Sequence, residues 1–324
     1  MAPNITVIIP AYNASKDISK CLDSCIKQDY DSYEIIVVND GSTDNTIEVV
    51  NEYINKGYPI TIINKPNGGL VSARKEGLIQ AKGNYVFFID ADDYIEGNTF
   101  SSLMAVGQDA DIIIGDFVLE NSKAYKLPFQ HINFSMFSLD KDGMYCNYLT
   151  KAITPSLCGR LIKTTLLQPF LTPENFTIGE DFITNFLILD KVSTISVKLC
   201  SMPLYHYVQY ENSMINSYSK FSLNQRIKYI EWVVNFIESK FFDNSQFSNS
   251  LMDFLCNEYY SFLRDGGEIV NISLHEKIMH HRDFNQIVAT LPFWQRNLLK
   301  VYKFSPLIGK LYAITLRKLR SALK

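Results

Sequence analysis

Hydrophobic residues in the first hundred positions follow two alternating patterns. Short continuous apolar runs predict four β-strands, at residues 6–10, 34–39, 60–64 and 85–90. Between them, apolar residues recur at helical spacing and predict helices at 18–26, 43–54 and 69–81. Ser15 is the expected N-cap of the first of these helices. Continuously apolar strands are typical of a parallel sheet covered by helices on both faces, so the sequence predicts an α/β fold.

The remainder of the chain divides into two further parts. Residues 106–215 are less regular, with a predicted strand at 111–117 and a predicted helix after Gly179. From about residue 221 the pattern becomes helical and rich in aromatic side chains. We therefore expect three parts, 1–105, 106–215 and a helical C-terminal region at 216–324.

Polar residues gather where the first four predicted strands end. These strand ends run into four loops, at 10–13 (PAYN), 40–42 (DGS), 65–69 (KPNGG) and 90–93 (DADD). Ligands of parallel α/β sheets bind at the carboxyl ends of the strands. We therefore expect a bound nucleotide to meet all four loops.

Three carboxylates lie within four residues at the end of the fourth strand, Asp90, Asp92 and Asp93. Mg²⁺ and Mn²⁺ take oxygen ligands and commonly share them with substrate phosphates, so such an ion would relieve the repulsion between these carboxylates. The alternative is an acidic turn that caps the following helix.

Two other loops allow two interpretations each. The segment from Asn67 to Gly69 opens a helix and could offer free backbone N–H groups to a phosphate, or it could be a plain turn. The loop from Asp40 to Asp44 is either a turn that leads into a capped helix or a polar loop that reads a base.

Composition limits the class of protein. With 47% hydrophobic and 20% charged residues, the 324-residue chain can bury a large core. It has no apolar run of about 18 residues, as a membrane-spanning helix needs, and no N-terminal signal peptide is recognisable, so we expect a soluble cytoplasmic body. Its six cysteines form no CxxC pair, and Cys21 and Cys25 are expected to be core thiols.

The charge is unevenly distributed, although the net charge is only −3. Residues 292–324 contain eight Lys or Arg and no Asp or Glu, which leaves 23 basic against 34 acidic groups in 1–291. In this tail an apolar face bordered by cations, with Pro306 between two short helices, predicts a segment that lies on an anionic membrane. The alternative is a helix packed on the acidic body.

Taken together, the loops resemble a known family. The segments VIIPAYNA, VVNDGSTDNT, NKPNGGLVSARKEGL and FIDADD, in this order, closely resemble the family 2 glycosyltransferases of the bacterial surface-polysaccharide type, which have the GT-A fold. The resemblance covers about residues 4–215. It implies a metal-dependent, inverting transfer of a hexose or N-acetylhexosamine from a nucleotide diphosphate, expected to be UDP. The implied acceptor is a hydroxyl of a glycan or of a lipid-linked oligosaccharide.

The resemblance also implies roles in nucleotide binding. Pro10, Ala11 and Tyr12 would flank the nucleoside, and Asp40 would accept a hydrogen bond from uracil N3–H. Arg74 would lie near the diphosphate or the base. Asn67 is our candidate for the phosphate loop described above. Residues 1–105 would then form the nucleotide-sugar half of a GT-A domain, and 106–215 the acceptor half.

Further roles concern the sugar, the metal and the reaction. Asp90 would hold the ribose or the sugar, Asp92 would ligate Mn²⁺ or Mg²⁺, and Asp93 would face the donor sugar. The segment 179–182 (GEDF) resembles the family's GED signature, which makes Asp181 the catalytic base and places Glu180 near the donor sugar. In 156–163 (SLCGRLIK), Gly159 and Arg160 stand where the family usually has Asn-Lys.

His206 is a further candidate metal ligand, because the family often has a histidine in the segment around it that touches the metal or the diphosphate. The alternative is a buried histidine whose hydrogen bonds are satisfied within the protein.

Other enzyme classes fit less well. A dinucleotide oxidoreductase needs GxGxxG after a strand, a sugar nucleotidyltransferase a GxGxR-type loop, and a haloacid-type phosphatase its DxD at the first strand. Two alternatives stay open, a polyprenyl-phosphate sugar transferase and a non-catalytic nucleotide-sugar-binding module. We expect no nucleic-acid partner, and we expect a peripheral position on the cytoplasmic face of the membrane.

Overall fold

The computed structural model describes residues 3–121, 126–127, 138–169, 172–173, 175–209, 220–241, 244–266, 272–280, 284–305 and 308–315. The chain forms two compact units. The first consists of Met1–Tyr145 and Pro155–Asn216, and the second of Cys146–Thr154 and Ser217–Lys324. The predicted three-part division stays a prediction. Each unit is described by itself below.

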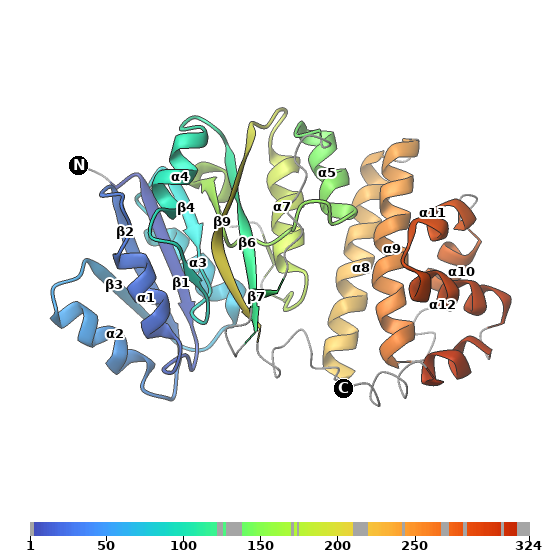
Figure 1. Ribbon diagram of the computed structural model, residues 1–324, viewed down its shortest axis with the longest axis horizontal. Helices are drawn as coiled ribbons and strands as arrows, with labels where there is room; N and C mark the ends of the chain where they lie inside the picture. The colour runs from blue at the N-terminus through green and yellow to red at the C-terminus, as the bar shows by residue number, and fades with distance from the viewer. Residues whose placement is uncertain are drawn as a thin grey trace. The chain divides into compact units, whose positions relative to one another are not determined.

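The first unit is built on one nine-stranded sheet (Figure 1). Its strand order is β3-β2-β1-β4-β8-β6-β9-β5, with β7 paired to β6. The strands are β1 (Ile5–Ala11), β2 (Tyr33–Asp40), β3 (Ile60–Lys65), β4 (Tyr85–Phe88), β5 (Tyr94–Ile95), β6 (Ile112–Asn121), β7 (Lys126–Leu127), β8 (Arg160–Lys163) and β9 (Val197–Gln209). The block β3-β2-β1-β4 is parallel, whereas β4 and β6 pair antiparallel with β8, and β9 runs parallel to β6.

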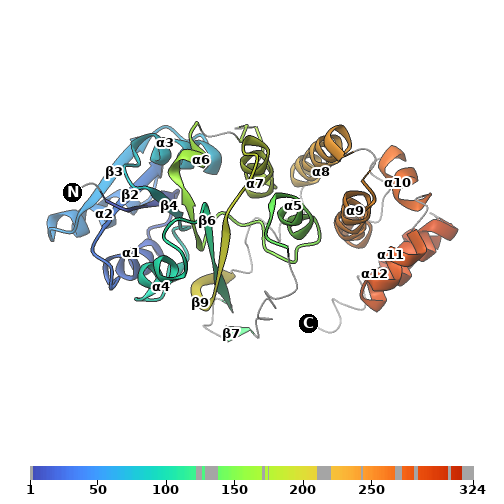
Figure 2. The same cartoon turned by 90° about the horizontal axis from the view of Figure 1, so that it is seen from above.

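Helices cover both faces of this sheet, as Figure 2 shows. The helices of this unit are α1 (Ile18–Ile26), α2 (Thr46–Asn55), α3 (Leu70–Gln80), α4 (Thr99–Val106), α6 (Thr164–Leu167) and α7 (Glu180–Lys191). Helix α5 (Lys141–Leu149) begins in the first unit and ends in the second. The crossovers β1-α1-β2 and β2-α2-β3 run in one direction along the sheet, and β3-α3-β4 runs back. Crossovers of one hand therefore place α1 and α2 on one face and α3 on the other.

The inner parallel strands β1, β2 and β4 are mostly apolar because both of their faces are covered. Every residue of β1 and β4 is buried, as are the last six residues of β2. The sheet reverses its winding at β1 and β4, so their carboxyl ends form the switch point at which α/β sheets bind ligands. The predicted α/β fold with a helical C-terminal region is confirmed.

Two local expectations were wrong. Ser15 is not the N-cap of the first helix, because α1 begins after Asp17, whose side chain makes no capping hydrogen bond. The second helix begins at Thr46 rather than at residue 43. The reason is that Asp44 accepts hydrogen bonds from the Thr46 backbone N–H (3.1 Å) and from the Ser15 backbone N–H (3.1 Å), which holds residues 43–45 in a turn.

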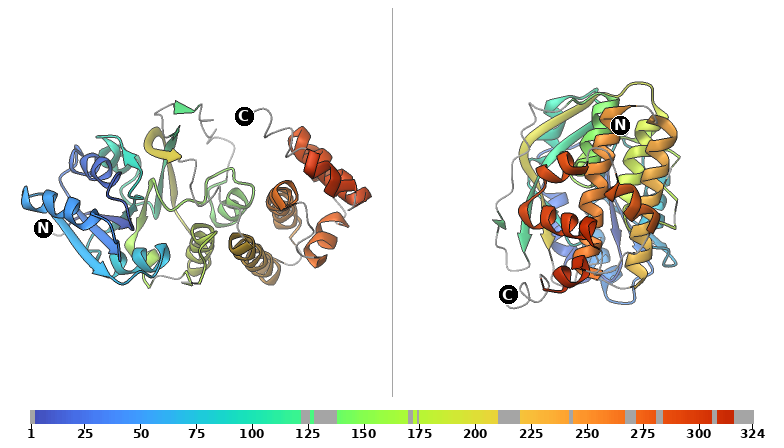
Figure 3. Two further views of the ribbon diagram at one scale, coloured as in Figure 1. Left: turned by 90° about the horizontal axis from the view of Figure 1, so that it is seen from below. Right: turned by 90° about the vertical axis from the view of Figure 1, so that its right-hand side faces the viewer.

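The second unit is helical in its described part. Its helices are α8 (Lys220–Phe241), α9 (Ser245–Gly266), α10 (Ile272–Met279), α11 (Phe284–Thr290) and α12 (Phe293–Phe304), and residues 308–315 are also helical. Helix α9 is central, with α8, α10, α11 and α12 packed against it (Figure 3). Its buried face includes Phe254, Leu255 and Tyr259. None of the helices in the described residues is long and apolar enough to cross a membrane.

Candidate active site

Asp40, at the carboxyl end of β2, is buried and fully engaged by neighbouring donors. Its Oδ1 accepts hydrogen bonds from Lys65 Nζ (2.5 Å) and from the Gly68 backbone N–H (2.9 Å). Its Oδ2 accepts one from the Gly69 backbone N–H (2.7 Å). A buried carboxylate needs such partners, and here they anchor the loop before α3 to the end of β2. The predicted contact between Asp40 and uracil stays a prediction.

This geometry bears on the two interpretations of the 67–69 loop, a phosphate-binding loop or a plain turn. The backbone N–H groups of Gly68 and Gly69 are taken by Asp40, which favours the turn. The loop lies directly on the β2 turn: Gly41 has a φ of +73°, and a Cβ atom there would lie 2.7 Å from the Asn67 backbone nitrogen. Gly41 therefore allows the two loops to meet, and Asn67 lies at their junction.

The residues that follow β1 differ in exposure. Pro10 and Ala11 belong to the strand and are buried. Tyr12 immediately beyond them is 53% exposed. An exposed aromatic ring at the carboxyl edge of a parallel sheet can stack on a nucleobase, which fits the predicted role of Tyr12.

The acidic turn after β4 places its three carboxylates in different surroundings. Asp92 is solvent-exposed, yet desolvation by the crowded turn, followed by the charge of Asp90, raises its pKa to about 6. Asp93 is 2% exposed, and burial followed by the charge of Asp90 raises its pKa to about 8. Its Oδ2 accepts a hydrogen bond from the Tyr205 hydroxyl (2.5 Å) and its Oδ1 one from the Val208 backbone N–H (2.8 Å). Asp93 thus fastens β9 to the acidic turn, and its predicted contact with the donor sugar stays a prediction.

A divalent cation fits this turn only in part. Within the described ranges, no three Asp, Glu, His or Cys side chains converge into a ready-made metal site. Asp92 and Asp90 nevertheless repel each other, and this repulsion adds to desolvation, the larger cause, in raising the pKa of Asp92. Mg²⁺ is commonly held by one or two carboxylates together with substrate phosphates. The turn therefore fits an ion whose remaining ligands come from the donor and from water.

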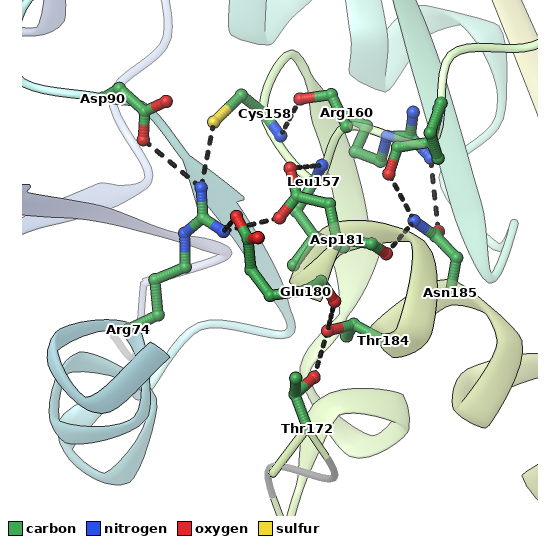
Figure 4. A network of polar contacts seen from close by, with 12 residues as sticks. Arg74, Asp90, Leu157, Cys158, Arg160, Thr172, Glu180, Asp181, Thr184 and Asn185 are labelled. Atoms are coloured by element: carbon green, nitrogen blue, oxygen red, sulfur yellow. Dashed lines mark hydrogen bonds and ion pairs between the residues drawn. The ribbon is translucent and has the colours of Figure 1, made fainter. Parts of the chain in front are cut away.

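Arg74 is a buried cation that connects the acidic turn to α7 (Figure 4). It projects from α3, and its Nη1 lies 2.5 Å from Asp181 Oδ1 and 3.8 Å from Glu180 Oε1. Its Nη2 lies 3.3 Å from Asp90 Oδ1 and 3.7 Å from Cys158 Sγ. Despite burial, which opposes the charged form, the nearby carboxylates, Asp181 first, raise the pKa of Arg74 well above its ordinary value. One guanidinium is therefore shared by three carboxylates, one from the acidic turn and two from α7.

Asp181 is held in place on both sides. Its Oδ1 accepts from Arg74 and its Oδ2 from the Leu157 backbone N–H (3.2 Å). Its backbone carbonyl accepts a hydrogen bond from Asn185 Nδ2 (2.8 Å), which also donates to the Pro155 carbonyl (2.6 Å). Each carboxylate oxygen has a further lone pair, and the side chain remains 22% exposed, so Asp181 can still accept a proton from a bound hydroxyl.

Glu180 begins α7 next to Asp181 and is mostly buried, with a side chain 17% exposed. Burial first, and then the charge of Asp181, raises its pKa to about 7, although Arg74 acts in the opposite direction. The first turn of α7 is further fixed by Thr184, whose hydroxyl donates to the Glu180 carbonyl (2.7 Å) and contacts Thr172.

His206 lies in β9, and both of its ring nitrogens face carboxylates. Nε2 lies 2.7 Å from Glu96 Oε1, and Nδ1 lies 3.0 Å from Glu120 Oε1. The ring is buried and stacks on Tyr94 at 4.1 Å, with Lys20 over the other side of the Tyr94 ring. A metal ion could bind His206 only by displacing one of these carboxylates.

Three residues of this site were given no role by the sequence analysis. Tyr205 connects two acidic residues, since its hydroxyl donates to Asp93 and accepts from the Asp90 backbone N–H (3.2 Å). Arg160, which replaces a family residue, is buried on β8 with Nη1 3.4 Å from Asn185 Oδ1. Lys65 could have been found, because it ends the strand next to β2 and pairs in register with Asp40.

Comparison with known proteins places this chain in a family. Residues 6–165 match the family model described as "Glycosyl transferase family 2". The chain is 36% identical over 200 residues to "Glycosyltransferase GlyA" of Streptococcus pneumoniae serotype 4, a match that covers 58% of this chain and 29% of GlyA. The chain therefore spans less than a third of that relative's length.

Solved structures show a similar fold. That of S. aureus TarS 1-349 in complex with UDP-GlcNAc matches 99% of this chain and 92% of its own, with a TM-score of 0.66 and 24% identity. A mannosyltransferase from Pyrobaculum calidifontis, in complex with GDP-Man and Mn²⁺, matches 98% of this chain and 86% of its own, with a TM-score of 0.52 and 17% identity. The likeness to TarS confirms the predicted GT-A fold. Through residues 6–165, this chain belongs to the family 2 glycosyltransferases.

Proposed function

We propose that this chain is an inverting glycosyltransferase that moves a hexose or N-acetylhexosamine from a uridine diphosphate carrier to an acceptor hydroxyl. The observation that carries the proposal is the position of Asp181. Its carboxylate is joined through Arg74 to the acidic turn, so a base and a diphosphate-binding turn lie on either side of one cation. The complex of TarS with UDP-GlcNAc supports the choice of a uridine donor.

Asp181 is the proposed general base. It would accept the proton of the acceptor hydroxyl while that oxygen forms a bond to the anomeric carbon. The bond between the anomeric carbon and the diphosphate oxygen breaks on the opposite face, and the nucleoside diphosphate leaves with the electron pair. Arg74 and Leu157 orient the carboxylate for this step, since they bind its two oxygens from different sides.

The acidic turn would hold the donor diphosphate through a divalent cation. Asp92, which is exposed, and Asp90 would supply protein ligands, with Mn²⁺ as the first candidate because the related mannosyltransferase fold was solved with that ion. The cation would stabilise the negative charge that develops on the departing diphosphate. His206 is left out of this set, because both of its nitrogens are bound to Glu96 and Glu120.

The nucleoside would lie over Tyr12, beside the strand ends that contain Pro10 and Ala11. Asp40 and Asn67 would shape this part of the site through the joined loops described above, and Asp40 would reach uracil N3–H only by giving up one of its loop contacts. Arg74, buried against carboxylates, is proposed to position Asp181 and Asp90 rather than to bind the nucleotide directly.

The acceptor is proposed to be a glycan or a lipid-linked oligosaccharide. The experiment that tests the proposal incubates the protein with UDP-hexoses and UDP-N-acetylhexosamines, with Mn²⁺ or with chelator, and with hydroxyl acceptors or a polyprenyl phosphate. Donor consumption is followed as released UDP, with Asp181→Asn as the paired variant. We expect metal-dependent UDP release that the variant lacks.

The alternatives give different results. Donor binding without transfer or hydrolysis would point to a nucleotide-sugar-binding module, and transfer to the polyprenyl phosphate alone would contradict the hydroxyl acceptor. Equal turnover by wild type and Asp181→Asn would contradict the assigned base.

A further inference from the structure

Exposed large hydrophobic side chains concentrate near the end of the described chain. Among the described residues ten are exposed, and half of these lie between 293 and 311: Phe293, Trp294, Phe304, Ile308 and Leu311. Phe304 is the most exposed of them, at 83%. Single exposed apolar residues are ordinary, whereas a group of this kind marks a surface that binds something.

Helix α12 explains why part of this group faces one way. Its buried residues, Leu298, Leu299 and Tyr302, lie on the side that packs within the second unit, against α9 and α11. An α-helix turns by about 100° per residue, so Phe293, Lys300 and Phe304 share the opposite side. The side of α12 away from the core therefore carries two exposed aromatic rings, with Lys300 between them. The exposed face of a helix in water is usually polar.

The following helical segment packs on the other side of α12, at Tyr302. A Cβ atom at Gly309 would lie 2.5 Å from the Tyr302 ring, so residues 308–315 pack on α12 at this glycine. Ala313 is buried, and Ile308 and Leu311 stay exposed. We call Phe293, Lys300 and Phe304, on the outward side of α12, the aromatic face.

The segment that carries the aromatic face has charges of one sign. Lys300, Lys303 and Lys310 are exposed, and residues 292–324 contain no Asp or Glu. A second copy of the same face would bring these cations together, which disfavours a symmetric dimer through it. An anionic surface would instead attract them.

We infer that the aromatic face binds the surface of an anionic lipid bilayer, with Phe293 and Phe304 in the headgroup region and Lys300 on the lipid phosphates. Trp and Phe favour the membrane interface, and each Lys near an anionic surface adds electrostatic attraction. The inference goes beyond the proposed transfer reaction and does not depend on it. Residues 306, 307 and 316–324 of the tail predicted from the sequence lie outside the described residues and carry no part of it.

The test is co-sedimentation of the full chain with vesicles. One set contains equal parts of phosphatidylglycerol and phosphatidylcholine, and the other contains phosphatidylcholine alone. We expect binding to the anionic set, weakened when the ionic strength rises from about 0.1 M to about 0.5 M. Phe293→Ser combined with Phe304→Ser should weaken binding by roughly tenfold or more. Lys300→Gln should weaken it about fivefold, which corresponds to about 1 kcal/mol per cation.

Matched controls come from the first unit. Ile79→Ser removes an exposed apolar side chain of α3, and Lys56→Gln removes an exposed lysine, and both should bind as the wild type does. Thermal melting checks that all variants fold, and UDP release from a soluble donor should be unchanged in the aromatic-face variants. Equal binding by wild type and the double Phe variant would overturn the inference. So would equal binding to both vesicle sets, or self-association that the Phe substitutions abolish.

Discussion

Arg74 Nη1 lies 2.5 Å from Asp181 Oδ1, although the two residues are 107 positions apart in the chain. The contact joins α3, which follows the nucleotide-side loops, to α7, which carries the proposed base. Because Arg74 also contacts Asp90, the charges of the acidic turn and of the base are coupled through one buried guanidinium. A substitution in the acidic turn should therefore change the surroundings of Asp181, and a substitution at Asp181 should change those of Asp90.

Arg74→Met should destabilise the fold. It leaves Asp90, Glu180 and Asp181 without their shared cation, and removal of one partner from a buried ion pair costs about 3–5 kcal/mol. The difference in free energy of unfolding between wild type and variant should shrink as the pH falls, because protonation of the carboxylates relieves their repulsion. Urea unfolding at several pH values measures it.

Lys82→Met, just beyond the end of α3 and exposed, is the control and should change the free energy of unfolding by less than about 0.5 kcal/mol. If Arg74→Met has the same free energy of unfolding as wild type at neutral pH, the buried cation does not stabilise the fold.

Glu180→Gln should change how stability depends on pH. Burial raises the pKa of Glu180 in the folded protein to about 7, above its ordinary value of 4.5. Between these values the folded state binds more protons than the unfolded state, so wild-type stability falls as the pH rises through this range. The free energy of unfolding of the Gln variant does not fall in this way. Relative to wild type it should rise by roughly 2–3 kcal/mol between pH 4.5 and pH 7.

Exposed Glu52→Gln in α2 is the matched control, and its stability should follow the wild-type pH dependence. If Glu180→Gln and wild type show parallel curves, the carboxyl group is not held protonated by the fold.

Asp92→Asn should separate metal binding from folding. The side chain is exposed, so the melting temperature should stay within a few degrees of wild type. Mn²⁺ should strengthen UDP binding to the wild type, by isothermal titration calorimetry, and should have little effect on the variant. Equal Mn²⁺ enhancement in both proteins would remove Asp92 from the metal site.

Asp44→Ala should weaken the start of α2 by about 1 kcal/mol, the usual cost of losing a capping side chain. Burial acts to raise the Asp44 pKa, but hydrogen bonds from Thr46 and Ser15 outweigh it and lower the pKa to about 2. This contribution is present above about pH 3.8 and is lost as the pH falls towards 2, so the gap between wild type and variant should close in acid. A gap that persists at pH 2 would contradict this role.

The sequence predicts the parallel sheet and the polar residues at its strand ends well, because both depend on local pattern and on the rule that parallel strands end at one edge. It predicts the partners of the polar groups poorly. The pattern left open whether the amides of Gly68 and Gly69 are free, and Asp40, 28 and 29 positions earlier, accepts hydrogen bonds from them. The attachment of Asp93 to Tyr205 depends likewise on strand pairing far along the chain.

The account depends most on Asp181 as the base of a single displacement. The most direct measurement is the anomeric configuration of the product, determined by proton NMR on material formed from a UDP-sugar by the wild-type protein and by Asp181→Asn. We predict a product whose anomeric configuration is opposite to that of the donor, and a loss of rate of roughly 10²–10⁴ in the variant. A product that retains the donor's configuration would contradict the mechanism.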